Sequence, residues 1–453
     1  MSNASLVSSF GIDATGLNPA NFDYRLNAKD KKSLFDISIF SLGGGYGTDT
    51  TIGFYNNYLS YLSINRETFT DLFTDLPAVL KFRQEVLPGS KQQVNYDFEL
   101  KWFSMNYVNP KLGAFNLTMS DKVGLNTNVN SRDDYLPLTF LVTFYPDSSY
   151  DLTNVKLNQS EAIAWWIRKY SLGYAKQFHL AKGDFINSIS FGFSAGLVHG
   201  FGNVITYNSK LDVNTYGIKK NITTGLTHVD SIRGYQDFSS LAALTDFFRD
   251  YNDGAQSQFD FFPKPAGKGY SLDFGTTIQF SEKWKLAFSV TDIGKITWDY
   301  NTFVNYDKEN FFYQNFTLNA SDPTYNQFVN DLEGLDSRDT TSSYETDMPT
   351  KYRAGLMFQP SEKLLIELNW MKGINNLPGN SDANIFSLGS EFFPSPFIPI
   401  RAGVSVGGPG DYFISLGMGL KLKYFSLDIA TQGINQLIAN KRFSVSFSGK
   451  LTL

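Results

Sequence analysis

The sequence predicts an all-β fold, an antiparallel β-barrel that crosses a membrane, and three observations lead to this prediction. Aromatic residues make up 16% of the 453 residues and charged residues only 18%, whereas soluble proteins carry about 25% charged residues. Apolar and polar residues alternate along many segments, which is the period of a strand with two different faces. No apolar run reaches the length of roughly 18 residues that a membrane-spanning helix needs.

The segment 443–453 has the clearest alternation, because large apolar residues and Ser, Lys or Thr residues occupy alternate positions. A strand with one face in lipid and the other in a wet lumen has this pattern. The same pattern recurs at 94–102, 189–197, 270–280, 284–291 and 414–424.

Charged residues in the predicted strands fall opposite the large apolar residues. A Lys or Arg in lipid costs about 2–4 kcal/mol at the bilayer midplane, so we expect these side chains in the lumen. They are Glu99, Lys101, Asp273, Lys285, Arg353, Glu367 and Lys421. The tryptophans lie in or beside strands, where their rings would form a belt at the headgroup level.

Three segments have helical rather than strand spacing, namely 64–86, 235–253 and 322–336. Each lies between strand pairs, so we expect long extracellular loops with short helices. Long ordered loops are often functional, and apolar residues of these loops are the candidates for binding a hydrophobic ligand or a partner. The candidates are Phe69, Leu72, Phe73, Leu241, Leu244 and Phe248.

The first 33 residues lack strand character. We therefore divide the chain into residues 1–33, an N-terminal plug or hatch segment, and residues 34–453, the transmembrane barrel. The segment could fill the lumen or lie free in the periplasm. A barrel must be exported through the periplasm, so we expect an outer-membrane location and a signal peptide that this numbering omits.

Other classes of function find little support in the sequence. The chain has no cysteine, three histidines and a net charge of −5, so we expect no metal site, no cofactor and no nucleic-acid partner. Two segments have hydrolase-like Gly-x-Ser-x-Gly spacing, at 192–196 and 403–407. Both lie within continuing alternation rather than at a strand-to-helix elbow, so we expect no catalytic residue and no enzyme.

Several short motifs resemble the FadL-like outer-membrane transport family, in particular an uncharacterised branch of it. The motifs are Asn18-Pro19-Ala20, the glycine-rich segment 267–275, the hairpin end 291–298, and the segments 400–403 and 417–419. The resemblance implies a barrel of 14 strands whose N-terminal segment folds into the lumen. It also implies that Asn18, Pro19 and Ala20 belong to the plug, that helical outer loops capture hydrophobic ligands, and that an inward strand kink opens a lateral path.

The sequence and the resemblance together predict passive transport of hydrophobic small molecules across the outer membrane of a Gram-negative cell. Outer-membrane lipid would surround the barrel. The alternative is a non-catalytic accessory or scaffold subunit of an outer-membrane protein secretion or assembly complex, which would bind other outer-membrane or periplasmic proteins. Fold membership alone does not decide between these functions.

Overall fold

The computed structural model describes most of the chain. The described ranges are 4–23, 33–48, 92–129, 152–158, 161–180, 185–220, 226–246, 260–317, 321–327, 338–408, 412–437 and 442–453, with single residues at 224 and 319.

Fourteen strands of the described residues form a closed antiparallel ring, because each pairs with the next and β19 pairs with β1. In order around the ring they are β1 (Leu34–Thr48), β2 (Gln92–Asn109), β3 (Gly113–Val129), β5 (Glu161–His179), β6 (Ser188–Lys220), β8 (Gly267–Gln279), β9 (Trp284–Trp298), β13 (Lys351–Ser361), β14 (Leu364–Gly373), β15 (Ile385–Ser395), β16 (Ile398–Gly407), β17 (Tyr412–Lys421), β18 (Phe425–Gln432) and β19 (Arg442–Thr452).

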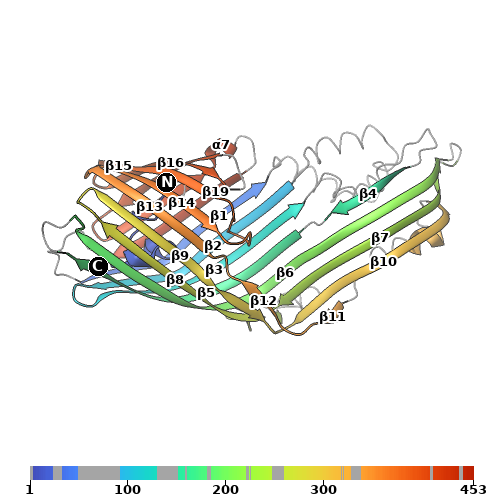
Figure 1. Ribbon diagram of the computed structural model, residues 1–453, viewed down its shortest axis with the longest axis horizontal. Coiled ribbons are helices and arrows are strands. Elements are labelled where there is room, and N and C mark those ends of the chain that lie inside the picture. The colour runs from blue at the N-terminus through green and yellow to red at the C-terminus, as the bar shows by residue number, and fades with distance from the viewer. Residues whose placement is uncertain are drawn as a thin grey trace.

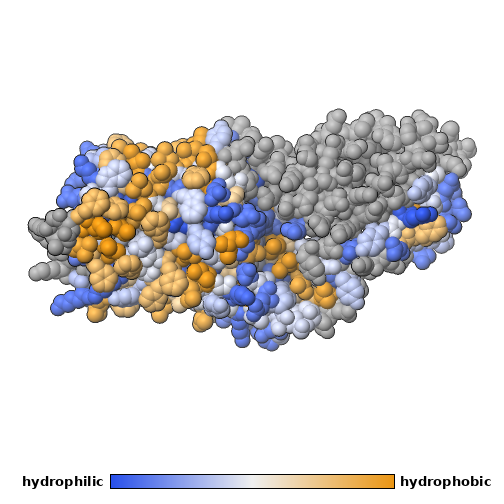
Figure 2. All heavy atoms as spheres, viewed as in Figure 1, coloured by the Kyte–Doolittle hydropathy of each residue, from blue (hydrophilic) through white to orange (hydrophobic). Residues whose placement is uncertain are grey.

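The two faces of the ring differ as the alternation predicts. On β6, Phe193 and Leu197 point outward and are 49% and 67% exposed, whereas Ser194 between them is 4% exposed. On β8, Phe274 is exposed and Asp273 is buried. Figure 2 shows hydrophobic residues gathered over the ring on the face in view. An apolar outer belt around a polar lumen is the arrangement of a transmembrane β-barrel.

None of the helices in the described ranges is long and apolar enough to cross a membrane.

The connections at the two ends of the ring differ in length. At the end where Phe35 and Leu453 pair, hairpins such as β13–β14 and β8–β9 have short turns. The connections at the other end are longer, among them 298–351 between β9 and β13. Short turns face the periplasm and long loops face the outside in such barrels, so we assign the second end as the outer one.

An arm of β-sheet continues from the outer end of the ring, on the right in Figure 1. β6 has 33 residues, which at 3.3 Å per residue is roughly 110 Å and far exceeds one membrane crossing. Its second half pairs with β7 (Thr227–Leu244), and β7 pairs with β10 (Thr302–Thr317). Three shorter strands flank the arm and its base: β4 (Leu152–Asn158), β11 (Arg338–Thr340) and β12 (Tyr344–Asp347).

The predicted helix over 235–253 is wrong as far as the structure describes it. Residues 235–244 belong to β7 and pair on both sides, with β6 and with β10. Backbone pairing to two neighbours outweighs the helical spacing of a few apolar residues. A single helical turn occupies 323–327 within the third predicted segment, and 64–86 lies outside the described residues. The remaining regular elements are α7 (Ile434–Leu437) and two 3₁₀ turns, η1 (Gly11–Ala14) and η2 (Pro19–Phe22).

One ion pair breaks the apolar pattern of the outward face. Arg168 on β5 and Asp121 on β3 point outward and form two hydrogen bonds, of 2.5 and 2.8 Å. The guanidinium is 1% exposed, lies over the Phe201 and Phe261 rings and donates to the Phe261 carbonyl at 2.6 Å. Mutual pairing and this aromatic cover make the two charges tolerable at the outer rim of the belt.

Candidate functional site: the lumen and its N-terminal segment

The N-terminal segment, residues 4–23, lies inside the ring. It forms hydrogen bonds with strands on all sides of the lumen, which only an interior position allows. The wall residues that bond to it are Lys101 and Asn106 (β2), Asn116 (β3), Gln177 (β5), Thr277 (β8), Ser289 (β9), Glu367 (β14) and Lys450 (β19).

Buried carboxylates and hydroxyls of the wall satisfy the backbone of this segment. The Glu367 carboxylate, which is fully buried, accepts from the backbone N–H of Val7 at 2.8 Å and of Ser8 at 3.1 Å. The Ser289 hydroxyl donates to the Leu17 carbonyl at 2.6 Å. Backbone groups that leave water need such partners, because an unpaired group costs about 1–3 kcal/mol. The segment is therefore held by specific bonds as well as by packing.

Apolar side chains of the segment pack on the wall in two clusters. Leu6 and Val7 contact Ala287, Met357 and Leu365. Nearer to β2 and β5, Ala14 and Phe22 form the second cluster with Val108, Ala114 and Ala175. Burial of these side chains contributes roughly 1.5–3 kcal/mol for each large one.

Asn18, Pro19 and Ala20 form the tightest contact between the segment and the wall. All three are buried. The Asn18 side chain caps the turn η2 by accepting from the Ala20 N–H at 3.1 Å, and Pro19 takes the first position of the turn, where its missing N–H is not needed. Asn18 Nδ2 also donates to Thr277 Oγ1 at 2.9 Å.

Two paired glycines make this contact possible. Gly192 on β6 and Gly275 on β8 face each other across the strands. A Cβ on Gly192 would overlap the Pro19 backbone, and one on Gly275 would overlap Asn18 Oδ1. Glycine lets the backbone of the wall and that of the segment approach closely, so the Asn18-Pro19 turn lies directly against β6 and β8.

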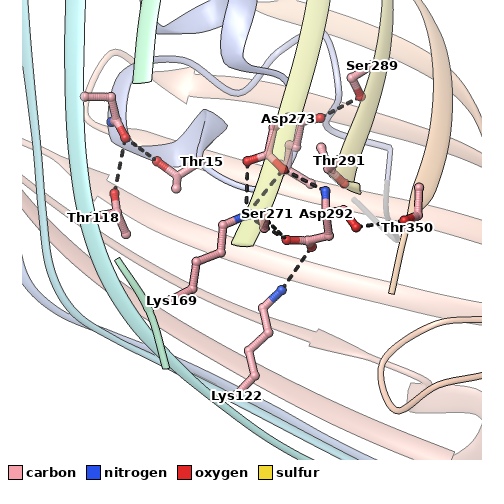
Figure 3. A network of polar contacts seen from close by, with 12 residues as sticks. Thr15, Thr118, Lys122, Lys169, Ser271, Asp273, Ser289, Thr291, Asp292 and Thr350 are labelled. Carbon is pink, nitrogen blue, oxygen red and sulfur yellow. Dashed lines mark hydrogen bonds and ion pairs between the residues drawn. The ribbon is translucent and has the colours of Figure 1, made fainter. Parts of the chain in front are cut away.

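An ion network crosses the lumen on the outer side of the segment (Figure 3). The Lys169 ammonium lies 2.6 Å from Asp292 Oδ1 and 3.1 Å from Asp273 Oδ2, and Lys122 Nζ lies 3.4 Å from Asp292 Oδ2. Lys122 is on β3 and Asp292 on β9, with three ring strands between them. Four strand spacings of 4.8 Å are about 19 Å along the wall, so the two side chains meet across the lumen.

Asp292 itself is an extra residue in its strand. The register between β8 and β9 shifts at this point, and Asp292 has a φ of 59°, a left-handed conformation that Asp tolerates better than most residues. Its N–H donates to Asp273 Oδ1 at 2.7 Å, and its carbonyl accepts from the Thr350 hydroxyl at 2.7 Å. The bulge thus places the carboxylate in the network and interrupts pairing with the next strand.

The connection 374–384, between β14 and β15, folds into the outer mouth of the barrel. Asn380 Nδ2 donates to the Thr350 carbonyl at 3.1 Å, and a Cβ on Gly124 of β3 would overlap Pro378. Leu377 packs against a buried apolar cluster that includes Trp165, Trp298 and Met348. The lumen is therefore narrowed at two levels, by this connection outside and by residues 4–23 inside.

Comparison with known proteins identifies the family of the chain. A family model described as "Family of unknown function (DUF5723)" matches residues 42–431. The chain belongs to this family. No curated protein matches it.

Among solved structures, the DUF5723 chain is similar to a Pseudomonas aeruginosa FadL homologue at 12% identity and a TM-score of 0.43, covering 100% of this chain and 98% of that chain. It is similar to the Ralstonia pickettii toluene transporter TbuX at 10% identity and a TM-score of 0.43, with coverage of 100% and 97%. The P. putida toluene transporter TodX matches at 9% identity and a TM-score of 0.36, with coverage of 99% and 92%.

Two apolar grooves lie on the outside of the DUF5723 barrel. One, of about 910 Å³, runs over Gly192 and Gly275 between the rings of Phe193, Phe274 and Phe288. On the other side of these two glycines lies the Asn18-Pro19 turn. The second groove, of about 860 Å³, is lined by residues of β1 to β7 that include Tyr96, Phe98, Trp166 and Leu244.

The structure describes two of the six predicted ligand-binding residues. Leu241 and Leu244 lie on β7 at the base of the arm, and Leu244 lines the second groove. Phe69, Leu72, Phe73 and Phe248 lie outside the described residues. Their role in ligand binding stays a prediction.

Among the charged residues predicted to face the lumen, Lys101, Lys285, Asp273 and Glu367 contact the N-terminal segment or the ion network. Sequence reasoning did not single out Lys122, Lys169 or Asp292. In the sequence these three residues stand out only as charged residues at inward-facing positions of strands. This does not reveal their partners, which lie on distant strands.

The serines of the hydrolase-like segments lie within strands, as expected. Ser194 and Ser405 are buried on β6 and β16. His199 lies on the opposite face of β6 from Ser194, beside the Tyr170 ring. The described residues hold no cluster of three or more His, Asp or Glu side chains arranged to bind a metal ion.

Proposed function

We propose that this protein is an outer-membrane channel for the passive uptake of small molecules with a hydrophobic part, and that residues 4–23 are its plug. The observation that carries the proposal is the segment inside the ring, with bonds to strands all around the lumen. Gly192 and Gly275 also support the proposal. Because they have no side chain, only the backbone of β6 and β8 separates the Asn18-Pro19 turn from the outer groove, which a purely structural segment would not need. No step requires a catalytic group or a nucleotide.

The proposed path has three steps. The ligand collects on the apolar groove that includes Leu244, together with the predicted loop residues. It enters the lumen past the connection 374–384. Displacement of the Asn18-Pro19 turn then lets it leave, either through the wall or toward the periplasm, down its gradient. Lipid of the outer membrane covers the apolar belt throughout.

Deletion of residues 4–23 tests the plug. We expect the shortened chain to fold, because the ring closes through pairs that do not involve the segment, and to conduct ions in planar bilayers far better than the full chain. In cells of a Gram-negative host that lacks its own uptake channel, uptake of a small solute with an apolar body and charged ends should become faster. Unchanged conductance with a folded barrel would contradict the plug.

A matched pair of glycine variants tests the same point without deletion. Gly192→Leu should push the Asn18-Pro19 turn away from the wall, since overpacking costs about 1–3 kcal/mol. Gly449→Leu is the control, because a Cβ there meets nothing within 4 Å. Only the first variant should raise conductance; equal conductance in both would count against the proposed exit.

A second function, that of a non-catalytic scaffold subunit of a secretion or assembly complex, is favoured by the arm. The outer half of β6 extends beyond the ring and pairs with β7, which pairs with β10, and this arm can contact other proteins. The two functions differ in one measurement. A scaffold keeps stoichiometric protein partners through purification and conducts no better after the plug is deleted.

A further inference from the structure

A cavity of about 560 Å³ lies in the outer half of the lumen. Its inner boundary includes Ser5 and Leu17 of the plug, and its outer boundary includes Gly379 and Asn380 of the inward-folded connection. The volume is in the range that binds small ligands, about 300–1,000 Å³. Under the proposed uptake function, a solute on its way through the lumen meets this space, so the lining influences which solutes are accepted.

The cavity carries opposite charges on opposite walls. Asp97 and Glu99 of β2 line one side, and Lys351 and Arg353 of β13 line the other. Arg442 of β19 also lines the cavity and has an interaction partner of its own. Around the ring of fourteen, five strands separate β2 from β13 in one direction (β3, β5, β6, β8, β9) and seven in the other. The two pairs therefore face each other almost across the full diameter.

No two of these four charges form a direct ion pair, although Asp97 and Lys351 attract each other at longer range and Glu99 also lies near Lys122 and Lys101. Among the described residues, none of them forms an ion pair within 4 Å, and the Lys351 ammonium forms no hydrogen bond. Arg353 makes one, from Nη1 to Thr291 Oγ1 at 2.7 Å, which leaves most of its five donors unused. The network of Lys122, Lys169, Asp273 and Asp292 deeper in the lumen is paired, in contrast.

Apolar side chains line the cavity between the charged walls. Met371 and Phe413 offer a thioether and a ring to a ligand, and the glycines at 43–45 keep the β1 wall flat. A ligand that fits this lining has an apolar body and a charge at each end, of opposite sign. An uncharged hydrocarbon would displace water from four charges that have no direct ion-pair partner, without replacing the hydrogen bonds of that water, which is unfavourable.

We propose that the cavity binds small zwitterions with an apolar body, such as short peptides with apolar side chains. The ligand's ammonium lies at Asp97 and Glu99, and its carboxylate lies at Lys351 and Arg353. The opposed charges hold the molecule across the lumen and orient it. This proposal rests on the proposed uptake function and names the substrate class that the lumen selects within it.

Four charge forms of one dipeptide test the proposal. L-leucyl-L-phenylalanine is a zwitterion, its N-acetyl form an anion, its amide a cation, and its N-acetyl amide neutral. Binding is measured by calorimetry on the purified full chain in detergent, and passage by swelling of liposomes that contain it. A charge-assisted hydrogen bond contributes about 1.5–3 kcal/mol, so the zwitterion should bind at least about tenfold more tightly than either singly charged form.

Variants of the two charged walls test which wall binds which end of the ligand. The double variant Lys351→Met with Arg353→Met should weaken binding of the zwitterion and the anion about tenfold or more, and leave the cation unaffected. Asp97→Asn with Glu99→Gln should do the reverse. Lys372→Met is the control, because this lysine pairs beside Tyr352 on the outward face of β14. Each variant must keep the β-sheet circular dichroism of the unchanged chain.

The outcomes separate the two proposals. Charge-dependent binding without passage of any form supports the site and contradicts uptake. Passage of all four forms at one rate contradicts the site and leaves uptake standing. Binding of the neutral form as tightly as the zwitterion, or equal loss of all forms in the Lys351–Arg353 variant, overturns the assignment of the cavity.

Discussion

At the scale of single residues, the ion pair of Arg168 and Asp121 is the sharpest test of the environment on the outward face. Two short hydrogen bonds join the side chains, and both residues are at least 95% buried. Removing one partner of a buried pair costs about 3–5 kcal/mol, because the other charge stays buried without compensation. Removing both together costs much less, since apolar groups suit this face.

We therefore expect Asp121→Asn and Arg168→Met each to lower the free energy of unfolding by about 3–5 kcal/mol, and the double variant to recover much of that loss. Unfolding in detergent by urea measures all three. The pair of Lys295 and Glu345, 3.1 Å apart but 53% and 56% exposed, is the control. Its double-variant cycle should give at most about 1 kcal/mol, and a similar coupling energy for both pairs would contradict the buried environment.

Sequence reasoning at this scale correctly predicted which face a residue occupies and missed which residue it contacts. Phe274 and Asp273 are adjacent, and their opposite faces follow from alternation alone. The partners of Asp273 come from β5 and from a bulge in β9, and these depend on how the ring closes. Arg168 and Asp121 lie on the apolar face for a similar reason, because each is tolerated there only through the other.

At the scale of elements, the bulge at Asp292 reverses the faces of β9. Before it, Ala287 and Ser289 contact the plug from the inward side. After it, Ile296 and Trp298 are the buried residues. Side chains alternate with a period of two along a strand, so one extra residue moves the inward-facing positions from odd-numbered to even-numbered residues. The change is not visible as a reversal in the sequence, because the large apolar residues of β9 lie at even positions before Asp292, and Ile296 and Trp298 again lie at even positions after it. The sequence prediction followed the alternation only as far as residue 291 and so missed the reversal.

Deletion of Asp292 should therefore turn residues 293–298 to the wrong faces. Trp298, which is fully buried, would leave its cluster, and loss of a buried Trp costs about 3–5 kcal/mol. Hydrogen exchange should show lost protection over β8 and β9, and the unfolding temperature should fall. Asp292→Gly is the control for the lost carboxylate. This variant also loses the ion pairs with Lys169 and Lys122, but glycine keeps the left-handed conformation and so should keep Trp298 buried. Equal hydrogen-exchange protection of residues 293–298 in the two variants would show that the bulge does not set the faces of β9.

The prediction of a helix over 235–253 was also wrong for a reason that belongs to this scale. Leu241 and Leu244 are three residues apart, which fits a helix turn as well as it fits positions on a strand. Pairing of β7 with two long neighbours decides between them, and those neighbours lie far away in the sequence. Spacing within a short window cannot contain this information.

At the scale of the whole molecule, the composition and the alternation predicted the barrel, and the structure places the same polar and apolar faces around a closed ring. The arm was not predicted, because its strands alternate without a continuous apolar face and so lack the signal of a membrane crossing. The part of β6 that spans the membrane and the part that projects into the arm belong to one continuous strand. The outward residues of β6 should therefore contact lipid only within the ring.

Two substitutions of exposed apolar residues test where lipid meets the barrel. Leu172 is 62% exposed in the middle of the outward face of β5, and Phe185 is 81% exposed in the turn between β5 and β6. In a protein surrounded by water, a lysine at either position would cost little. In a bilayer, Leu172→Lys should lower the free energy of unfolding by about 2–4 kcal/mol, whereas Phe185→Lys near the interface should lower it by at most about 1 kcal/mol. Reversible unfolding from lipid vesicles measures both, and a Leu172→Lys cost no larger than that of Phe185→Lys would mean that the apolar belt faces something other than hydrocarbon.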